Sequence, residues 1–168
     1  MKDEDCMAMA ERVLRQIKKG AFLTVQADNA MNIMTIGWTS IGFMWGRSIM
    51  TILVRTSRFT FGLIERASDF TVSVPITDMK KELEFCGSHS GGKVDKMKKC
   101  GLKMSPGEKV KTPVLNIPGI HFECRIVYKS PLNPDALADS YRHLYPDKDY
   151  HTIYFGEIVH CYSTGTET

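Results

Sequence analysis

The sequence Met-Asn-Ile-Met-Thr-Ile-Gly-Trp-Thr-Ser occupies residues 31–40, and Arg-Thr-Ser-Arg-Phe-Thr follows at 55–60. The first stretch is rich in residues that favour strands, and a further strand is expected at 48–54. Ser57 is a residue type that caps helices, so a helix is expected over 58–67. This part of the chain therefore predicts two strands that lead into a helix start with basic and hydroxyl side chains.

Outside this stretch, the hydrophobic pattern predicts further short strands and few, short helices. We expect helices at 5–19, 78–85 and 94–100, strands at 21–27, 31–44, 69–74, 120–129 and 149–162, a turn or short helix at 134–145, and a loop with one short strand at 104–119. Strands and helices do not alternate regularly, which argues against a doubly wound parallel sheet. We therefore predict a mainly β fold, an antiparallel barrel decorated by helices.

Composition excludes several classes of protein. A chain of 168 residues with 43% hydrophobic and 24% charged residues is typical of one globular domain. The net charge is only +3, and the sequence has no dense basic stripe of the kind that would predict nucleic-acid binding. No apolar run is long enough to span a membrane, and the acidic, polar start of the chain does not resemble a signal peptide.

The cysteines and histidines are scattered along the chain. Five cysteines without a CxxC pair, in a chain without a signal peptide, predict reduced thiols and a cytoplasmic location. Neither the cysteines nor the five histidines have the spacing of metal ligands, so no metal site is expected.

The turn at 55–60 has the chemistry to bind an anion. A helix N-terminus carries unpaired N–H groups and partial positive charge. Arg55, Ser57, Arg58 and Thr60 add charged and hydroxyl donors that match a phosphate. Taken alone, however, the turn is more typical of a capped helix start with two surface arginines.

The strand at 32–40 suits a flat ring. Gly37 lies between Thr35 and Thr39 on one strand face, which would let a planar ligand lie against the backbone. Trp38 is available to stack on such a ligand or to wall its pocket. Taken alone, a barrel strand with a core tryptophan is the more common interpretation.

Three further features are ambiguous by themselves. His151 is a candidate for positioning a substrate or donating a proton, although a lone strand histidine is more often a partly exposed polar residue. The Ser88–Lys96 loop suits an anion-binding nest and equally a flexible connector. Cys86 has no identifiable basic partner, so we expect it to be inert.

Together, these residues resemble a known family. The motifs are Asn32-x-Met34-Thr35-Ile36-Gly37-Trp38, Arg55-x-Ser57-Arg58-x-Thr60, Cys86-Gly87-x-x-Ser90-Gly91 and His151-Thr-Ile153-Tyr-Phe155-Gly156-Glu157-Ile158. Their order is that of the flavin reductase-like proteins, and the chain is most similar to the flavoredoxin branch from about residue 20 to 162.

The resemblance implies a six-stranded antiparallel Greek-key split barrel with a few flanking helices. The whole chain, 1–168, would be a single FMN-binding domain, with an N-terminal helix at 1–19, the barrel and helical insertions at 20–162 and a tail at 163–168. The family pattern also implies a homodimer with one FMN per subunit near the interface.

The resemblance assigns roles to the motif residues. The implied cofactor-binding residues are Asn32, Met34, Thr35, Ile36, Gly37, Trp38, Arg55, Thr56, Ser57, Arg58, Thr60, Ser90 and Lys96. Residues 32–38 would line the isoalloxazine and ribityl chain, 55–60 would hold the phosphate, and Ser90 and Lys96 would close over the cofactor. The chain departs from the family where Ser90-Gly91-Gly92-Lys93 replaces Ser-Gly-Arg-Asp and Asp149-Tyr150-His151 replaces Gly-Asp-His. Both departures bear on nicotinamide docking rather than on FMN binding.

The expected activity is that of an FMN-dependent oxidoreductase. Hydride would come from NADH or NADPH, with His151 positioning the nicotinamide, and electrons would pass to free flavin or another acceptor. One alternative is an electron carrier that keeps its FMN and acts between redox protein partners. The other is a barrel that binds a ligand without redox chemistry.

Overall fold

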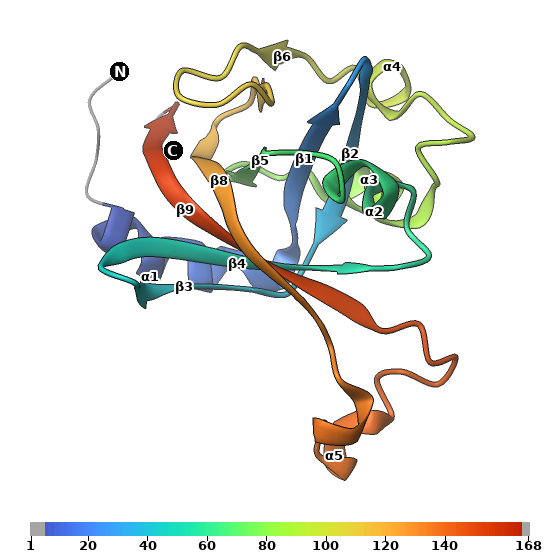
Figure 1. The fold of residues 1–168 in the computed structure, drawn as a ribbon. Helices are drawn as coiled ribbons and strands as arrows, with labels where there is room; N and C mark the ends of the chain where they lie inside the picture. Colours follow the sequence, from blue (N-terminus) through green and yellow to red (C-terminus); the bar gives the residue numbers. More distant parts are fainter. Residues whose placement is uncertain (1–5, 166–168) are drawn as a thin grey trace.

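The computed structural model describes residues 6–165, and its main feature is one antiparallel sheet of seven strands (Figure 1). The strands are β1 Ala21–Ala27, β2 Ala30–Ile36, β3 Thr39–Met44, β4 Arg47–Arg55, β5 Asp69–Pro75, β8 Gly119–Pro131 and β9 His151–Thr164, in the order β2-β1-β5-β8-β9-β4-β3. A separate hairpin pairs β6 Met104–Ser105 with β7 Val114–Leu115. Residue 5 of the expected helix and residues 166–168 of the expected tail lie outside the described residues.

The mainly β, antiparallel prediction is confirmed, but the count of six strands is corrected to seven. The single strand expected at 31–44 is two strands, β2 and β3, separated by Gly37 and Trp38. β2 pairs with β1 and β3 pairs with β4, so these consecutive strands form the two edges of the sheet. The sheet therefore curls until its edges meet at Gly37 and Trp38, without closing into a barrel.

The helices are short, as expected. They are α1 Cys6–Gln16, η1 Ile17–Lys19, α2 Phe59–Ile64, α3 Lys80–Ser88, α4 Lys96–Cys100, η2 Pro134–Ala136 and α5 Asp139–Arg142. The prediction that Ser57 caps α2 is wrong. Arg58 is the N-cap of α2 and makes no side-chain cap hydrogen bond, while the Ser57 hydroxyl bonds to Asp149 instead.

Two hydrophobic clusters hold this arrangement together. The larger fills the inside of the curled sheet, and α1 adds Met9, Val13 and Ile17 to it. The smaller lies between β1, β2, α3 and the segment around β7, and includes Phe22 and Leu83. β1 and β5 are consequently buried on both faces, which stabilises the part of the sheet that carries β2.

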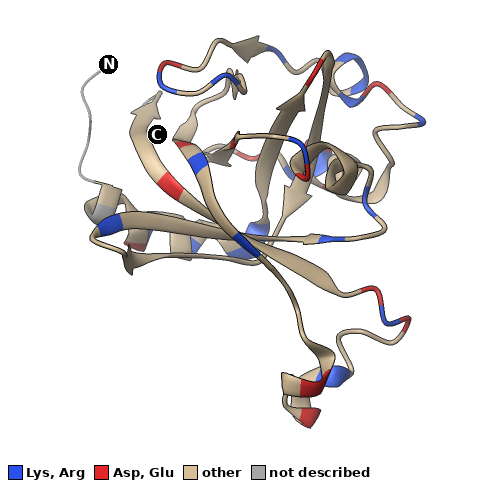
Figure 2. Ribbon diagram, in the orientation of Figure 1, with Lys and Arg blue, Asp and Glu red and all other residues tan. Residues whose placement is uncertain are grey.

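Charged residues are spread over the whole fold (Figure 2). Lys and Arg are interspersed with Asp and Glu over the elements in Figure 2, and the α5 segment projects from the sheet. No helix within residues 6–165 is apolar and long enough to cross a membrane. Within the same residues, no cluster of three or more His, Cys, Asp or Glu side chains is arranged to hold a metal ion.

Candidate functional site

Two neighbouring hollows lie where β2, β4, α2 and the α3–α4 loop meet. The polar hollow, of about 130 Å³, is lined by Asn32, Met34, Ser57, Arg58, Phe59, Thr60, Cys86, Gly87, Ser88, His89, Ser90, Gly91 and Lys96. A second hollow, of about 170 Å³, is lined by Met34, Thr35, Ile36, Gly37, Trp38, Leu53, Arg55, Arg58 and His151. We call it the apolar hollow after its Met34, Ile36 and Trp38 side chains, although polar atoms make up more than half of its exposed lining. Met34 and Arg58 line both. The structure therefore brings together every predicted cofactor-binding residue except Thr56, and His151 with them.

A buried hydrogen bond joins the two motifs at the polar hollow. The Asn32 side-chain amide donates to the Thr60 hydroxyl over 2.7 Å, which links β2 to the first turn of α2. Both side chains are buried. The strand predicted to face a ring and the turn predicted to hold a phosphate are thus fixed relative to each other.

Lys96 lines the polar hollow and joins neighbouring elements through its side chain. Its ammonium donates to the carbonyls of Ile33 at 3.0 Å and Cys86 at 2.7 Å, and its side chain is buried. Burial lowers the pKa of Lys96 from its ordinary value. Lys96 therefore ties α4 to β2 and α3, and both this buried side chain and the exposed Ser90 line the polar hollow.

The glycines at 91–92 allow the α3–α4 loop to lie against the site. A Cβ on Gly91 would come within 2.0 Å of the Asn32 side-chain oxygen, and one on Gly92 within 2.9 Å of the Phe59 ring. Any larger residue would push this loop away from the hollow. The sequence marked the loop as a possible anion nest, and its position beside Asn32 is a result of the tertiary fold.

The rings of Trp38 and His151 line the apolar hollow. The Trp38 and His151 ring centroids are 5.0 Å apart, and the Tyr145 hydroxyl lies 2.8 Å from His151 Nδ1. Trp38 is 41% exposed, whereas His151 is buried rather than partly exposed. Burial, together with the nearby Arg55 charge, lowers the pKa of His151 to about 4. The imidazole is therefore neutral at pH 7 and is not a ready proton donor.

The first part of the predicted phosphate turn is engaged with the segment before β9. Arg55 donates to the carbonyls of Asp149 at 2.7 Å and Leu144 at 3.1 Å. Thr56 and Ser57 donate to the Asp149 carboxylate. The sequence marked Asp149-Tyr150-His151 only as a departure from Gly-Asp-His, and only the fold places Asp149 on the turn.

Sequence reasoning missed some lining residues. Phe59, at the start of α2, is 42% exposed and lines the polar hollow. Leu53, an ordinary strand residue by sequence, lines the apolar hollow. Cys86 also lines the polar hollow, and burial raises the pKa of its thiol to about 12, in accord with the inert role expected for it. All five cysteines are free of disulfides.

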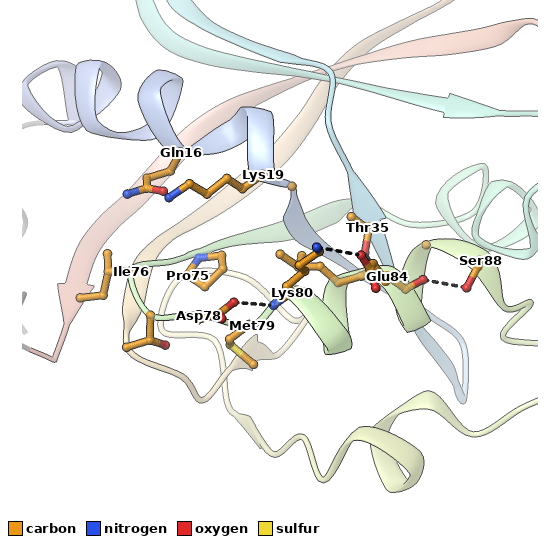
Figure 3. A pocket seen from close by; sticks show the side chains of 14 residues that line it. Gln16, Lys19, Thr35, Pro75, Ile76, Asp78, Met79, Lys80, Glu84 and Ser88 are labelled. Carbon is orange, nitrogen blue, oxygen red and sulfur yellow. Dashed lines mark hydrogen bonds and ion pairs between the residues drawn. The ribbon is translucent and has the colours of Figure 1, made fainter.

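A larger hollow of about 840 Å³ adjoins the site on the other side of Thr35 (Figure 3). Figure 3 shows Lys19 on one wall and Pro75 and Asp78 on the opposite one, with Thr35 at one end. The Thr35 hydroxyl donates to the carbonyl of Leu83 over 2.6 Å. Thr35 therefore separates this hollow from the apolar one and fixes β2 against α3.

Comparison with known proteins gives consistent matches. A family model described as "Flavin reductase like domain" matches residues 15–168. An uncharacterised protein of Archaeoglobus fulgidus is 27% identical over 139 residues, which cover 83% of this chain and 69% of that protein.

Two solved structures share the fold. The flavoredoxin of Methanosarcina acetivorans aligns with a TM-score of 0.66 and 26% identity, covering 86% of this chain and 68% of that one. The NADH:FAD oxidoreductase SgcE6 of Streptomyces globisporus aligns with a TM-score of 0.65 and 20% identity, covering 92% of this chain and 84% of that one.

Proposed function

Since this chain belongs to the flavin reductase like domain family, we propose that it is an FMN-dependent oxidoreductase that accepts hydride from NADH or NADPH. The observation that carries the proposal is the pair of adjoining hollows. One is lined mainly by hydroxyl, amide and charged side chains, and the other combines apolar and aromatic side chains with the polar groups of Arg55 and Arg58, with Arg58 at the boundary. A flavin with a charged phosphate at one end and a flat ring at the other matches this division.

The residues fit FMN in their chemistry. Arg58 and Ser90 would meet the phosphate at the polar hollow, since a charge-assisted bond from a guanidinium suits a phosphate oxygen. Met34, Ile36 and Trp38 would pack against the isoalloxazine in the apolar hollow, with the backbone of Gly37 beside it. FMN, when bound, supplies reversible two-electron acceptance from a nicotinamide. The protein binds and orients the ring and shields it from water.

His151 is proposed to shape the place where the nicotinamide docks. Because its imidazole is neutral at pH 7, its contribution is packing and hydrogen bonding rather than proton donation. Its Nδ1 is tied to Tyr145, and its ring faces Trp38. These contacts fix the ring beside the apolar hollow, so replacing His151 is expected to raise the KM for the nicotinamide donor more than it lowers FMN binding.

A homodimer is part of the proposal. The polar hollow and the apolar hollow are each smaller than the roughly 300 Å³ at which ligand pockets begin. A second copy that covers Trp38 and Phe59, both more than 40% exposed, would complete the enclosure and place FMN near the interface. Phe43 and Trp45, exposed at the β3–β4 turn beside Tyr128, offer further apolar surface for association. Sedimentation of the FMN-loaded protein tests this, and a monomer at micromolar concentration would contradict it.

An electron carrier between redox protein partners is the second candidate. It is favoured by the departure from Gly-Asp-His at 149–151 and by the match to a flavoredoxin. The two candidates differ in turnover. A reductase oxidises NADH or NADPH continuously when free FMN is supplied, whereas a carrier does not.

The deciding experiment is spectroscopic. We expect the purified protein to be yellow, with the absorbance of oxidised flavin, and to bleach on anaerobic addition of NADH or NADPH. If dithionite bleaches the flavin but neither NADH nor NADPH does, the electron carrier is favoured. A colourless protein that also fails to bind added FMN would overturn both candidates and favour a protein that binds some other ligand without redox chemistry.

A further inference from the structure

A carboxylate of the chain itself fills the hydroxyl-rich turn that the sequence assigns to the flavin phosphate. One oxygen of Asp149 accepts from the Ser57 backbone N–H and from the Thr56 hydroxyl, each over 3.1 Å. The other accepts from the Ser57 hydroxyl over 2.5 Å. A hydroxyl has a single proton to donate, so none of these three donors is available to a phosphate while Asp149 stays in place.

The segment that carries Asp149 is fixed against the same turn. Arg55 donates to the backbone carbonyl of Asp149, and the Thr56 N–H donates to that of Tyr150 over 3.3 Å. The Arg55 guanidinium also lies 4.9 Å from the centre of the Tyr145 ring. Lys148, just before Asp149, has a φ of +56°, in the left-handed region that non-glycine residues seldom adopt. The backbone is thus held in an uncommon conformation that brings the carboxylate onto the turn.

The group on the turn is an anion at neutral pH. Burial works to raise the pKa of Asp149, but the hydrogen bonds from Ser57 and Thr56 and the Arg55 charge outweigh it and lower the pKa. The charged groups facing Asp149 are Arg55 and, when protonated, His151. A phosphate brought to this turn would meet both the engaged donors and a like charge.

We propose that Asp149 is a specificity-determining residue that competes with the flavin phosphate for the donors of Thr56 and Ser57. The inference rests on the proposed flavin-binding function. FMN and riboflavin differ only in the phosphate. Because Asp149 occupies the donors of Thr56 and Ser57, the ratio of FMN affinity to riboflavin affinity should be smaller than if those donors were available to the phosphate. Arg58 and Ser90, which Asp149 does not contact, then carry most of the recognition of the phosphate.

The test compares two flavins on full-length variants stripped of cofactor. Asp149→Asn removes the charge and keeps the shape, and Asp149→Ser is a smaller neutral replacement. Asp147→Asn, which changes an exposed carboxylate two residues away, is the matched control. Dissociation constants for FMN and riboflavin are measured by flavin fluorescence, and thermal unfolding of each cofactor-free variant reports its folding.

Both Asp149 variants are expected to bind FMN about 3- to 10-fold more tightly than the wild type, the effect of removing one nearby like charge. Riboflavin affinity should stay within about twofold, and Asp147→Asn should change neither. Unchanged or weaker FMN binding by a folded Asp149 variant, with riboflavin unaffected, overturns the inference but leaves the proposed function standing. If the wild type binds neither flavin, the proposed function fails and this inference with it.

Discussion

The side-chain amide of Asn32 and the hydroxyl of Thr60 form a buried 2.7 Å hydrogen bond, and Gly91 lies directly against the same amide. Three segments that are separate in the sequence therefore meet at one side chain. β2, the start of α2 and the α3–α4 loop are held together there, and the polar hollow lies between them. The following predictions test the parts of this arrangement.

Gly91→Ala should displace the α3–α4 loop. A Cβ at this position would lie 2.0 Å from Asn32, and forced overpacking of this kind typically costs about 1–3 kcal/mol. Chemical unfolding should report this loss, and FMN affinity should fall with it. Gly42→Ala is the control, because a Cβ there meets nothing within 4 Å. Equal stability of the two variants would contradict the packing of this loop on Asn32.

Arg58→Ala should weaken FMN binding by about 1.5–3 kcal/mol, the scale of a charge-assisted hydrogen bond. Because the lost contact is to the phosphate, riboflavin affinity should hardly change. Titration calorimetry with the two flavins measures both. A parallel loss for FMN and riboflavin would place Arg58 at the ring instead of the phosphate.

Trp38→Ala should have the complementary effect. Removing a ring that packs on the isoalloxazine costs about 0.5–1.5 kcal/mol beyond the lost contact area, and both flavins contain that ring. FMN and riboflavin affinities are therefore expected to fall together. Tyr141→Ala, which removes an exposed aromatic side chain on α5 outside both hollows, is the control and should leave flavin affinity unchanged. Loss of affinity in the Tyr141 variant but not in the Trp38 variant would contradict a ring site beside β2.

Stability should rise with pH between about 4 and 6.5. Burial lowers the pKa of His121 and His151 to about 4, whereas a histidine in the unfolded chain titrates near about 6.5. Between these pH values the unfolded chain binds more protons than the folded one, so lowering the pH favours unfolding. Above about pH 6.5 both states are neutral at these histidines, and their contribution to the pH dependence of the free energy of unfolding ends.

Urea unfolding across this pH range measures the effect. His121→Asn should make the free energy of unfolding less dependent on pH, and its slope, not its absolute stability, is the quantity to compare. His143→Asn changes an exposed histidine and should keep the wild-type slope. An unaltered slope in the His121 variant would contradict neutral burial of this imidazole.

Local patterns predicted most of the elements because their causes lie within a few residues. β1, β5, α3 and α4 follow from alternation, helical spacing and the stop at Gly101, whose φ of +63° suits glycine. The break at Gly37 and Trp38 was missed, because strand-forming residues lie on both sides of Gly37 and a glycine also occurs inside continuous strands. What separates β2 from β3 is that they pair with different partners at opposite edges of the sheet.

The sequence by itself determined the residue types of the candidate site, since Asn32, Arg58, Ser90 and Trp38 recur in the order of a known family. It also determined the mainly β character of the chain. Only the tertiary structure decided which donors remain available at that site. Asp149 lies more than ninety positions after Thr56, and the pairing of β9 with β4, which sets Arg55 opposite His151, brings its carboxylate onto the turn. Pairing over such distances depends on the whole sheet, and no local pattern encodes it.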